Sequence, residues 1–183
     1  MLEFNFHPFP NISTERLALR KISEDDMEEI YFLRSDRQVL QFLDRDPIRS
    51  IDDATQWIQM IDEGIRTNQY IAWAITLKNE QKLIGTISFW NVKKEHHRAE
   101  IGYALHPLFQ GKGLMQEAMT PVLDYGFKQM KLHSVEANVN PNNVASIKLL
   151  EKNNFVREAY HKENYYYNGK FLDSAIYSLL TPY

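Results

Sequence analysis

The sequence predicts an α+β fold, a mixed α/β domain in which about four helices flank a strongly twisted, mostly antiparallel sheet of about six to seven strands. Strand-like and helix-like patterns alternate along the chain without an internal repeat or a linker. Between residues 98 and 139, a strand, a glycine loop, a helix and a further strand follow one another, and this crossover predicts one parallel junction in the sheet. At 183 residues, 44% of them hydrophobic, the chain suits a single domain over residues 1–183.

Composition limits the chemistry and the partners. The chain has no cysteine, which excludes disulfides, thiolate nucleophiles and thiolate metal sites. Its formal net charge is -3 and its basic residues are dispersed, so we expect no nucleic-acid partner. Because the start lacks a signal-peptide pattern, and no apolar run approaches the ~20 residues of a membrane helix, we expect a cytoplasmic protein without a membrane partner.

Strand and helix signals open the chain. Residues 14–20 alternate leucines with charged neighbours, which predicts a strand. Ser23 with Asp26 resembles a capping box, the arrangement that starts a helix. Apolar residues then recur at helical spacing (Met27, Ile30, Tyr31 and Leu33).

A second capping box, Ser50 with Asp53, predicts a helix that ends near Gly64. This helix should bury one apolar face (Ile51, Ala54, Trp57, Ile58 and Ile61). Residues 70–77 and 83–90 are rich in β-branched and aromatic residues and flank an Asn-Glu turn. They therefore predict two antiparallel strands.

Residues 98–105 complete an antiparallel meander and lead into the glycine loop at residues 110–113. The helix after the loop should bury four apolar side chains (Met115, Met119, Val122 and Phe127). Pro121 lies inside this helix, so we expect the helix to continue with a bend. A strand is expected next, at residues 133–139.

The last third predicts one helix and a hairpin. The helix at residues 144–153 should bury its apolar residues (Ala145, Ile147, Leu149 and Leu150), and Asn154 stands where a left-handed cap would end it. The strands at residues 155–167 and 171–180 are joined by an Asn-Gly pair, which favours a tight hairpin turn.

The start of the helix after the glycine loop is a candidate anion site. The first amides of a helix lack partners, and the helix dipole adds roughly half a positive charge there. The candidate phosphate ligands are the groups of the loop and first turn (Gln110, Gly111, Lys112, Gly113, Leu114 and Met115). The alternative is an ordinary glycine turn before a helix. A dinucleotide site is excluded because Gln116 stands where its third glycine belongs and the chain has too few strand–helix units.

Three motifs resemble one enzyme family. Gln110-Gly-Lys-Gly-Leu-Met, after a strand reading Ala-Glu-Ile-Gly-Tyr, resembles the acetyl-coenzyme A (acetyl-CoA) loop of the GNAT superfamily of N-acetyltransferases. Asn143-x-x-Ser146, followed by Leu-Leu-Glu-Lys-Asn-Asn-Phe, resembles the superfamily's second signature. Gly169-x-x-x-Asp173 resembles the C-terminal hairpin of the ribosomal-protein N-terminal acetyltransferase branch. Two residues depart from the pattern, because Met115 replaces a Gly or Ala and Asn154 replaces a Gly.

The resemblance implies acetyl-CoA as co-substrate, no metal, and a site on both signatures. The glycine loop and Asn143 would contact CoA, and the strand end near Leu105 would spread from its neighbour and pair with the pantetheine arm. Ser146 would be the acid that protonates the CoA thiolate, because Leu150 stands where many members have a tyrosine. Structural alternatives stay open, since Ser146 could bond its own helix backbone and Asn143 could be a helix cap.

Glu100 is the candidate base, acting through water on the incoming amine. On an alternating strand it shares a face with Arg98 and Gly102, and the alternative is a solvent-facing sheet carboxylate. The neighbouring pair His96-His97 suggests a metal site. On a strand, however, His97 and Glu100 would face opposite ways, so we expect no zinc.

We therefore expect an acetyl-CoA-dependent N-acetyltransferase that transfers the acetyl group directly to a primary amine. The resemblance implies a protein N-terminal α-amine or a small-molecule amine as acceptor. The alternative is a catalytically silent CoA-binding sensor or scaffold. Tyr165, Tyr166 and Tyr167 are hairpin packing residues or border the acceptor groove. The expected partners are acetyl-CoA and the amine acceptor, in a monomer or homodimer.

Overall fold

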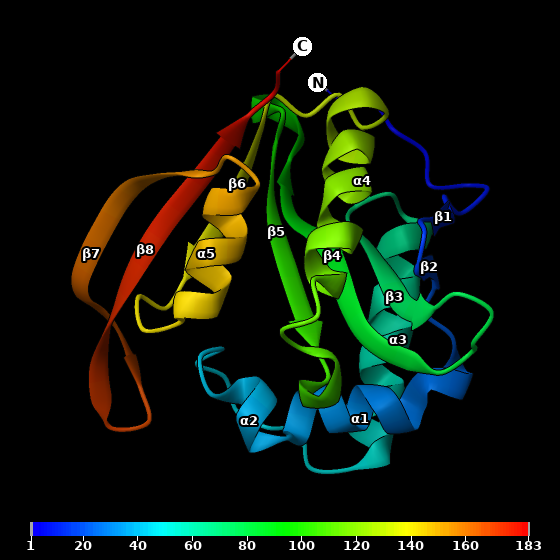
Figure 1. The fold of residues 1–183 in the computed structure, drawn as a ribbon, viewed down its shortest axis with the longest axis horizontal. Helices are drawn as coiled ribbons and strands as arrows, with labels where there is room; N and C mark the ends of the chain where they lie inside the picture. Colours follow the sequence, from blue (N-terminus) through cyan, green and yellow to red (C-terminus); the bar gives the residue numbers. More distant parts are fainter. Residues whose placement is uncertain (1, 183) are drawn as a thin grey trace.

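A computed structural model describes residues 2–182, so the two end residues of the predicted domain, 1 and 183, lie outside the described part. Eight strands form one sheet in the order β1-β2-β3-β4-β5-β6-β8-β7 (Figure 1). The β5–β6 pair is parallel and the other pairs are antiparallel, which confirms the predicted fold class. The strand beyond the predicted seven is β1 (Ile12–Ser13), which is too short to give a sequence pattern.

The N-terminal half contains β2 (Leu17–Lys21), α1 (Met27–Ser35), α2 (Arg37–Leu40), α3 (Ile51–Arg66), β3 (Ile71–Leu77) and β4 (Leu83–Lys93). Both predicted capping boxes are present, and the Asp53 N–H donates to Ser50 Oγ at 3.1 Å. The short helix α2 was not predicted. It begins because the Asp36 carboxylate accepts hydrogen bonds from two amides of its first turn.

The C-terminal half contains β5 (Arg98–Leu105), α4 (Leu114–Lys128), β6 (Ser134–Val139), α5 (Val144–Lys152), β7 (Val156–Tyr167) and β8 (Lys170–Leu180). Helix α4 continues through Pro121, and the bend stays a prediction. Asn154 takes the expected left-handed conformation with φ 64°. Asn168 and Gly169 form the expected tight turn between β7 and β8, with φ 47° and 78°.

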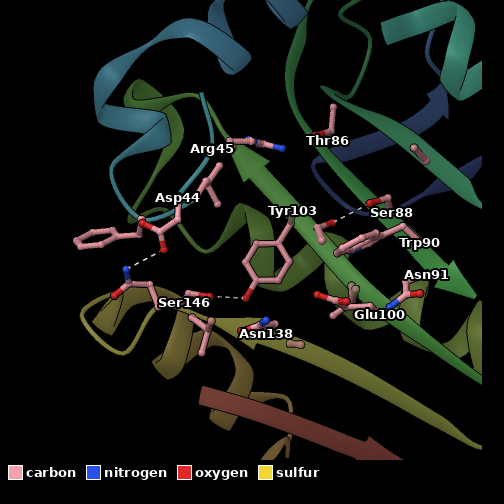
Figure 2. A pocket seen from close by; sticks show the side chains of 18 of the residues that line it. Asp44, Arg45, Thr86, Ser88, Trp90, Asn91, Glu100, Tyr103, Asn138 and Ser146 are labelled. Carbon is pink, nitrogen blue, oxygen red and sulfur yellow. Dashed lines mark hydrogen bonds between the residues drawn. The ribbon is translucent and has the colours of Figure 1, made fainter. Parts of the chain in front are cut away.

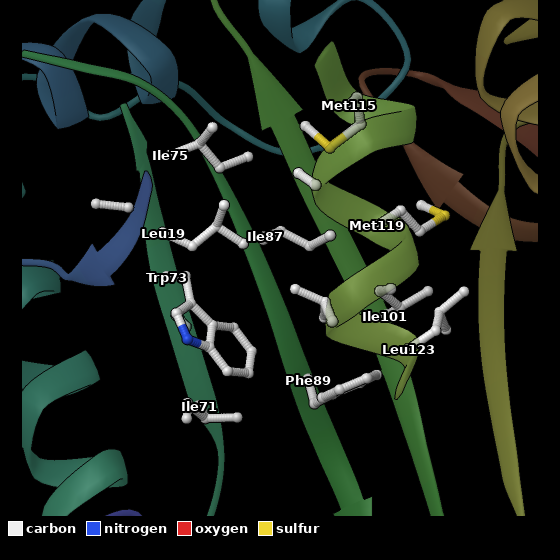
Figure 3. Close-up of a cluster of buried hydrophobic side chains, with 14 of the residues drawn as sticks. Leu19, Ile71, Trp73, Ile75, Ile87, Phe89, Ile101, Met115, Met119 and Leu123 are labelled. Carbon is white, nitrogen blue, oxygen red and sulfur yellow. The ribbon is translucent and has the colours of Figure 1, made fainter. Parts of the chain in front are cut away.

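Helices cover both faces of the sheet. Helix α4 lies on one face, where apolar side chains of β2, β3, β4 and α4 gather in one cluster (Figure 3). Helices α1 and α3 pack together on the opposite face (Figure 1). The predicted inward face of α4 is buried (Met115, Met119, Val122 and Phe127). Among residues 2–182, no helix has both the length and the apolar character that crossing a membrane requires.

Two burial predictions were wrong. Ile51 is 37% exposed because it occupies the first position of α3, at the edge of the packed region. Ala145 is also exposed, since the first turn of α5 lies beside the opening between β5 and β6 rather than over the sheet. Leu150, one turn further along α5, is fully buried as expected.

The parallel junction opens along its length. Strands β5 and β6 pair only where residues 98–100 meet residues 134–136. Beyond Glu100, β5 remains paired with β4 as far as Leu105, but its other edge has no strand partner. This is the separation that the family resemblance implied. It divides the sheet into one part with strands β1 to β5 and another with strands β6, β8 and β7.

Candidate functional site

A cavity of about 760 Å³ lies at the opening between β5 and β6 (Figure 2). Its walls come from α1, the loop after α2, α3, β4, β5, β6, α5 and β7. The predicted residues Glu100, Asn143 and Ser146 line it together. Leu105 and the loop residues 110–115 do not, so the predicted site residues fall in two separate places.

Ser146 faces a hydroxyl that the sequence reasoning missed. Its Oγ lies 2.6 Å from the hydroxyl oxygen of Tyr103 on β5 (Figure 2). Burial raises the pKa of Tyr103 to about 12, and the hydrogen bond to Ser146 opposes that rise only in part. Tyr103 is therefore protonated at neutral pH and can donate to the Ser146 oxygen.

The sequence offered one signal for Tyr103. Leu150 is fully buried and lines the cavity without a hydroxyl, so a tyrosine hydroxyl in this cavity must come from an element other than α5. Tyr103 is the hydroxyl-bearing residue of β5, the strand that leads to the glycine loop. Its proximity to Ser146 is a contact across 43 residues, which no local pattern encodes.

Asn143 is the N-cap of α5. Its Oδ1 accepts a hydrogen bond from the Ser146 N–H at 3.1 Å, so the structural alternative for this residue is present. Within residues 2–182 its Nδ2 donates to no protein group, and the residue lines the cavity. Asn143 thus fixes the start of α5 and keeps one donor for a ligand.

Glu100 is half-buried on the cavity wall. Burial raises its pKa above the ordinary value, a hydrogen bond from the Asn91 side chain opposes the rise, and the nearby charge of Glu136 adds to it. Asn91 reaches Glu100 because it takes a left-handed conformation, φ 46°, where the pairing of β4 with β5 shifts register (Figure 2). A carboxylate held this way can take up a proton closer to neutral pH than an exposed one.

The strand argument about His97 does not hold. His97 follows the 3₁₀ turn Lys94–His96 with φ 51° and precedes β5, so strand alternation does not decide where its side chain points. Across the described chain, no three His, Asp or Glu side chains gather closely enough to hold a metal ion.

The glycine loop presents a row of free amides. Gly111 and Gly113 have φ 72° and 75°, a conformation that glycine adopts without steric cost. Of the described residues, none accepts a hydrogen bond from the N–H groups of residues 111–116. The Gln110 side chain turns back and donates to the Leu105 carbonyl at 2.9 Å, while the Met115 side chain lies in the core.

Arg16 and Glu117 hold this loop against the start of the chain. Arg16 donates to the Lys112 carbonyl at 3.0 Å and to Glu117 at 2.6 Å, and Thr14 donates to the other Glu117 oxygen at 2.6 Å. The Lys112 side chain is exposed beside the free amides. The loop therefore combines fixed backbone donors with an exposed positive charge, as an anion site requires.

The chain resembles known acetyltransferases over nearly its full length. Residues 16–156 match the acetyltransferase (GNAT) domain. The uncharacterized N-acetyltransferase YoaA of Bacillus subtilis (strain 168) is 34% identical, over 95% of this chain and 98% of the relative. The spermidine N(1)-acetyltransferase of Vibrio cholerae serotype O1 is 25% identical, over 92% of this chain and 95% of the relative.

A solved structure of a ribosomal-protein acetyltransferase has the same fold as this chain. The crystal structure of ribosomal-protein-S5-alanine acetyltransferase from Vibrio fischeri superposes with a TM-score of 0.82 at 29% identity, over 94% of this chain and 97% of that chain. The domain match covers most of the chain and includes β5, the glycine loop and the start of α5. This protein therefore belongs to the GNAT family of acetyltransferases.

Proposed function

We propose that this protein transfers an acetyl group from acetyl-CoA directly to a primary amine bound in the cavity between β5 and β6. The observation that carries the proposal is the meeting of the Tyr103–Ser146 hydroxyl pair and the Glu100 carboxylate in one cavity at the open edge of β5. The acceptor is a protein N-terminal amine or a small-molecule amine. The relatives that act on a ribosomal protein and on spermidine represent these two classes.

The glycine loop fits the pyrophosphate of CoA. A Cβ atom added at Gly111 would meet no atom within 4 Å, so the loop is open to solvent at this residue. Those amides and Lys112 supply donors and positive charge for a phosphate. The unpaired edge of β5, near Leu105, suits the amide groups of the pantetheine arm, and Asn143 Nδ2 offers a further donor. When bound, acetyl-CoA supplies the thioester carbonyl that the amine attacks.

Glu100 and the hydroxyl pair move the protons. An α-amine has a pKa of about 8 and a lysine side chain a pKa of about 10.4. The acceptor therefore arrives largely protonated at neutral pH and needs a base. Glu100 takes that proton through water, helped by its raised pKa. Ser146 donates a proton to the departing sulfur and takes one up again from solvent, while Tyr103 holds the Ser146 oxygen in place through their hydrogen bond. Alignment of the two substrates lowers the activation free energy by on the order of 7 to 11 kcal/mol.

The proposal is tested by incubating purified protein with acetyl-CoA and a panel of peptides and polyamines. Free thiol release is followed with time, and acetylated products are identified by mass spectrometry. We expect turnover on at least one amine, and Ser146→Ala should lower turnover far more than CoA affinity. CoA binding without turnover on any amine would refute the proposal and support the silent sensor or scaffold instead.

A further inference from the structure

Two arginines line the acceptor side of the cavity without a hydrogen-bond or ion-pair partner among the described residues. Arg34 lies in the last turn of α1, and Arg45 lies in the loop between α2 and α3. Figure 2 shows Arg45 reaching from that loop across the cavity toward strands β4 and β5. In residues 2–182, neither side chain forms a hydrogen bond or an ion pair, and the Nε of each is buried without an acceptor. Both guanidinium groups are thus available to a ligand.

Arg20 shows how the same chain treats a half-buried arginine elsewhere. Its two terminal nitrogens donate to the Asp26 carboxylate at 2.8 and 2.7 Å, and each of them also donates to a backbone carbonyl. Only its Nε lacks a partner. Burying a guanidinium without a carboxylate is unfavourable, so the absence of any such partner for Arg34 and Arg45 indicates that another anion supplies it.

The cavity's own carboxylates do not neutralise the two arginines. Asp44 accepts hydrogen bonds from Asn140 at 3.0 Å and from the Tyr165 hydroxyl, and forms no ion pair with either arginine. Glu100 is held by Asn91 on β4. Neither arginine therefore has a carboxylate of the described chain as a direct partner in this cavity. The two arginines are also close enough to repel, because the pKa of Arg34 is lowered to about 10 by burial and, secondarily, by the charge of Arg45.

The Arg34 side chain and the backbone at Arg45 are held in place before any ligand arrives. Arg34 stacks over the Trp57 ring at 4.6 Å, which leaves its edge free to donate. The amide of Ile48 donates to the Arg34 carbonyl at 3.0 Å and ties the loop to α1. Asp44, left-handed at φ 46° and bonded across the cavity mouth, fixes the chain direction at Arg45. This preorganisation is typical of a binding site rather than of a mobile surface charge.

We propose that the acceptor carries an anionic group, a carboxylate or a phosphate, which Arg34 and Arg45 bind while its amine lies toward Glu100. This inference rests on the proposed acetyl transfer and narrows its acceptor class. The anion comes from an acidic residue close to a peptide N-terminus or from a small amino acid or phosphorylated amine. Polyamines have no such group, so they fit this cavity poorly.

Matched acceptors test the inference. Peptides with Glu at the second, third or fourth position are compared with the same peptides carrying Gln, and a free amino acid is compared with its amide. Phosphoethanolamine, ethanolamine and spermidine complete the panel. We expect the anionic member of a pair to have a kcat/KM higher by roughly 10-fold to 100-fold, the range that charge-assisted hydrogen bonds provide.

Variants connect the preference to the two arginines. Arg45→Gln and Arg34→Gln should abolish the discrimination without changing the KM for acetyl-CoA, and Arg45→Glu should favour a lysine-bearing peptide. Arg37→Gln is the matched control, because Arg37 is exposed on α2 and should leave the discrimination intact. Melting curves of all variants verify that each protein is folded.

Three results would overturn the inference: equal rates within every pair, a preference that survives both Gln substitutions, or a rise in the acetyl-CoA KM that assigns the arginines to the coenzyme. Binding of each pair is also titrated with CoA present. Arginine-dependent binding of the anionic member without turnover would uphold the anion site and refute the acetyl transfer. The two proposals can therefore fail separately.

Discussion

Removal of the Tyr103 hydroxyl tests whether Tyr103 and Ser146 act as one proton donor. The two oxygens are 2.6 Å apart, and the raised pKa of Tyr103 keeps its hydroxyl protonated. In the proposed mechanism Ser146 gives a proton to the thiolate and Tyr103 assists only through Ser146. Tyr103→Phe, Ser146→Ala and the double variant together form a cycle that measures this dependence.

The magnitudes follow from the geometry. A positioned proton donor contributes at least ~100-fold to a rate, so Ser146→Ala should lower kcat by about that factor, or ~2.7 kcal/mol in activation free energy. Tyr103→Phe removes one hydrogen bond and keeps the donor, so we expect a loss of ~10-fold, or ~1.4 kcal/mol. Once Ser146 is gone the tyrosine has nothing to assist. The double variant should therefore be ~100-fold slower than the unchanged enzyme, not ~1000-fold.

The assay is thiol release with both substrates saturating, accompanied by a CoA titration and a melting curve for each variant. Each substitution should cost ~1 kcal/mol of unfolding free energy at most, because it removes one hydrogen bond. Tyr166→Phe is the control, since Tyr166 is 65% exposed on the hairpin and should leave kcat unchanged. If the two single losses in kcat multiply in the double variant, Tyr103 and Ser146 act independently, and the proposal that they act as one proton donor is refuted.

Four further predictions concern the pH dependence of kcat, the pH dependence of stability, the glycine loop and the cavity residue Arg45. Burial raises the pKa of Glu100, so kcat should rise with pH through that raised value, and Glu100→Gln should flatten the rise. If kcat of the Glu100→Gln variant still rises with pH in the same range, Glu100 is not the base. The raised pKa also means that the folded state binds this proton more tightly than the unfolded state, so the unchanged protein loses unfolding free energy as pH rises through that pKa. Glu100→Gln lacks this loss, so its unfolding free energy should increase relative to that of the unchanged protein as pH rises. Glu117→Ala removes the hydrogen bonds that Arg16 and Thr14 donate to Glu117, and should raise the acetyl-CoA KM with a loss of ~1 kcal/mol in unfolding free energy. An unchanged KM would show that these contacts do not contribute to acetyl-CoA binding. Arg45→Met removes an unpartnered charge and should raise the melting temperature, corresponding to ~1 kcal/mol; a lower melting temperature would show that Arg45 has a structural partner.

Local signals predicted the parts of the fold that local interactions determine. The bounds of β5 match the predicted strand, because alternation and the following Pro107 are both local. The Asn168-Gly169 turn was predicted for the same reason, since the two residues alone satisfy the positive φ that the hairpin needs. Helix α2 was missed because it depends on one capping side chain, Asp36, and has no periodic face.

Contacts between distant segments could not be predicted from the sequence. Tyr103 and Ser146 meet because β5 separates from β6 beyond Glu100, and this separation is a property of the whole sheet. No sequence pattern singled out Arg34, since nothing in its neighbourhood shows that Trp57 would cover its guanidinium. Arg45 reaches the cavity through a loop whose path is set by long-range bonds of Asp44.

A crystal structure of the CoA complex tests the central claim most directly. The account predicts that the pyrophosphate accepts hydrogen bonds from the amides of residues 111–116 and that the pantetheine arm follows the open edge of β5. The CoA sulfur should then lie within hydrogen-bonding reach of Ser146 Oγ, on the side of the cavity that faces Glu100. A sulfur placed away from Ser146, or a pyrophosphate bound elsewhere than the glycine loop, would contradict the assignment of this site.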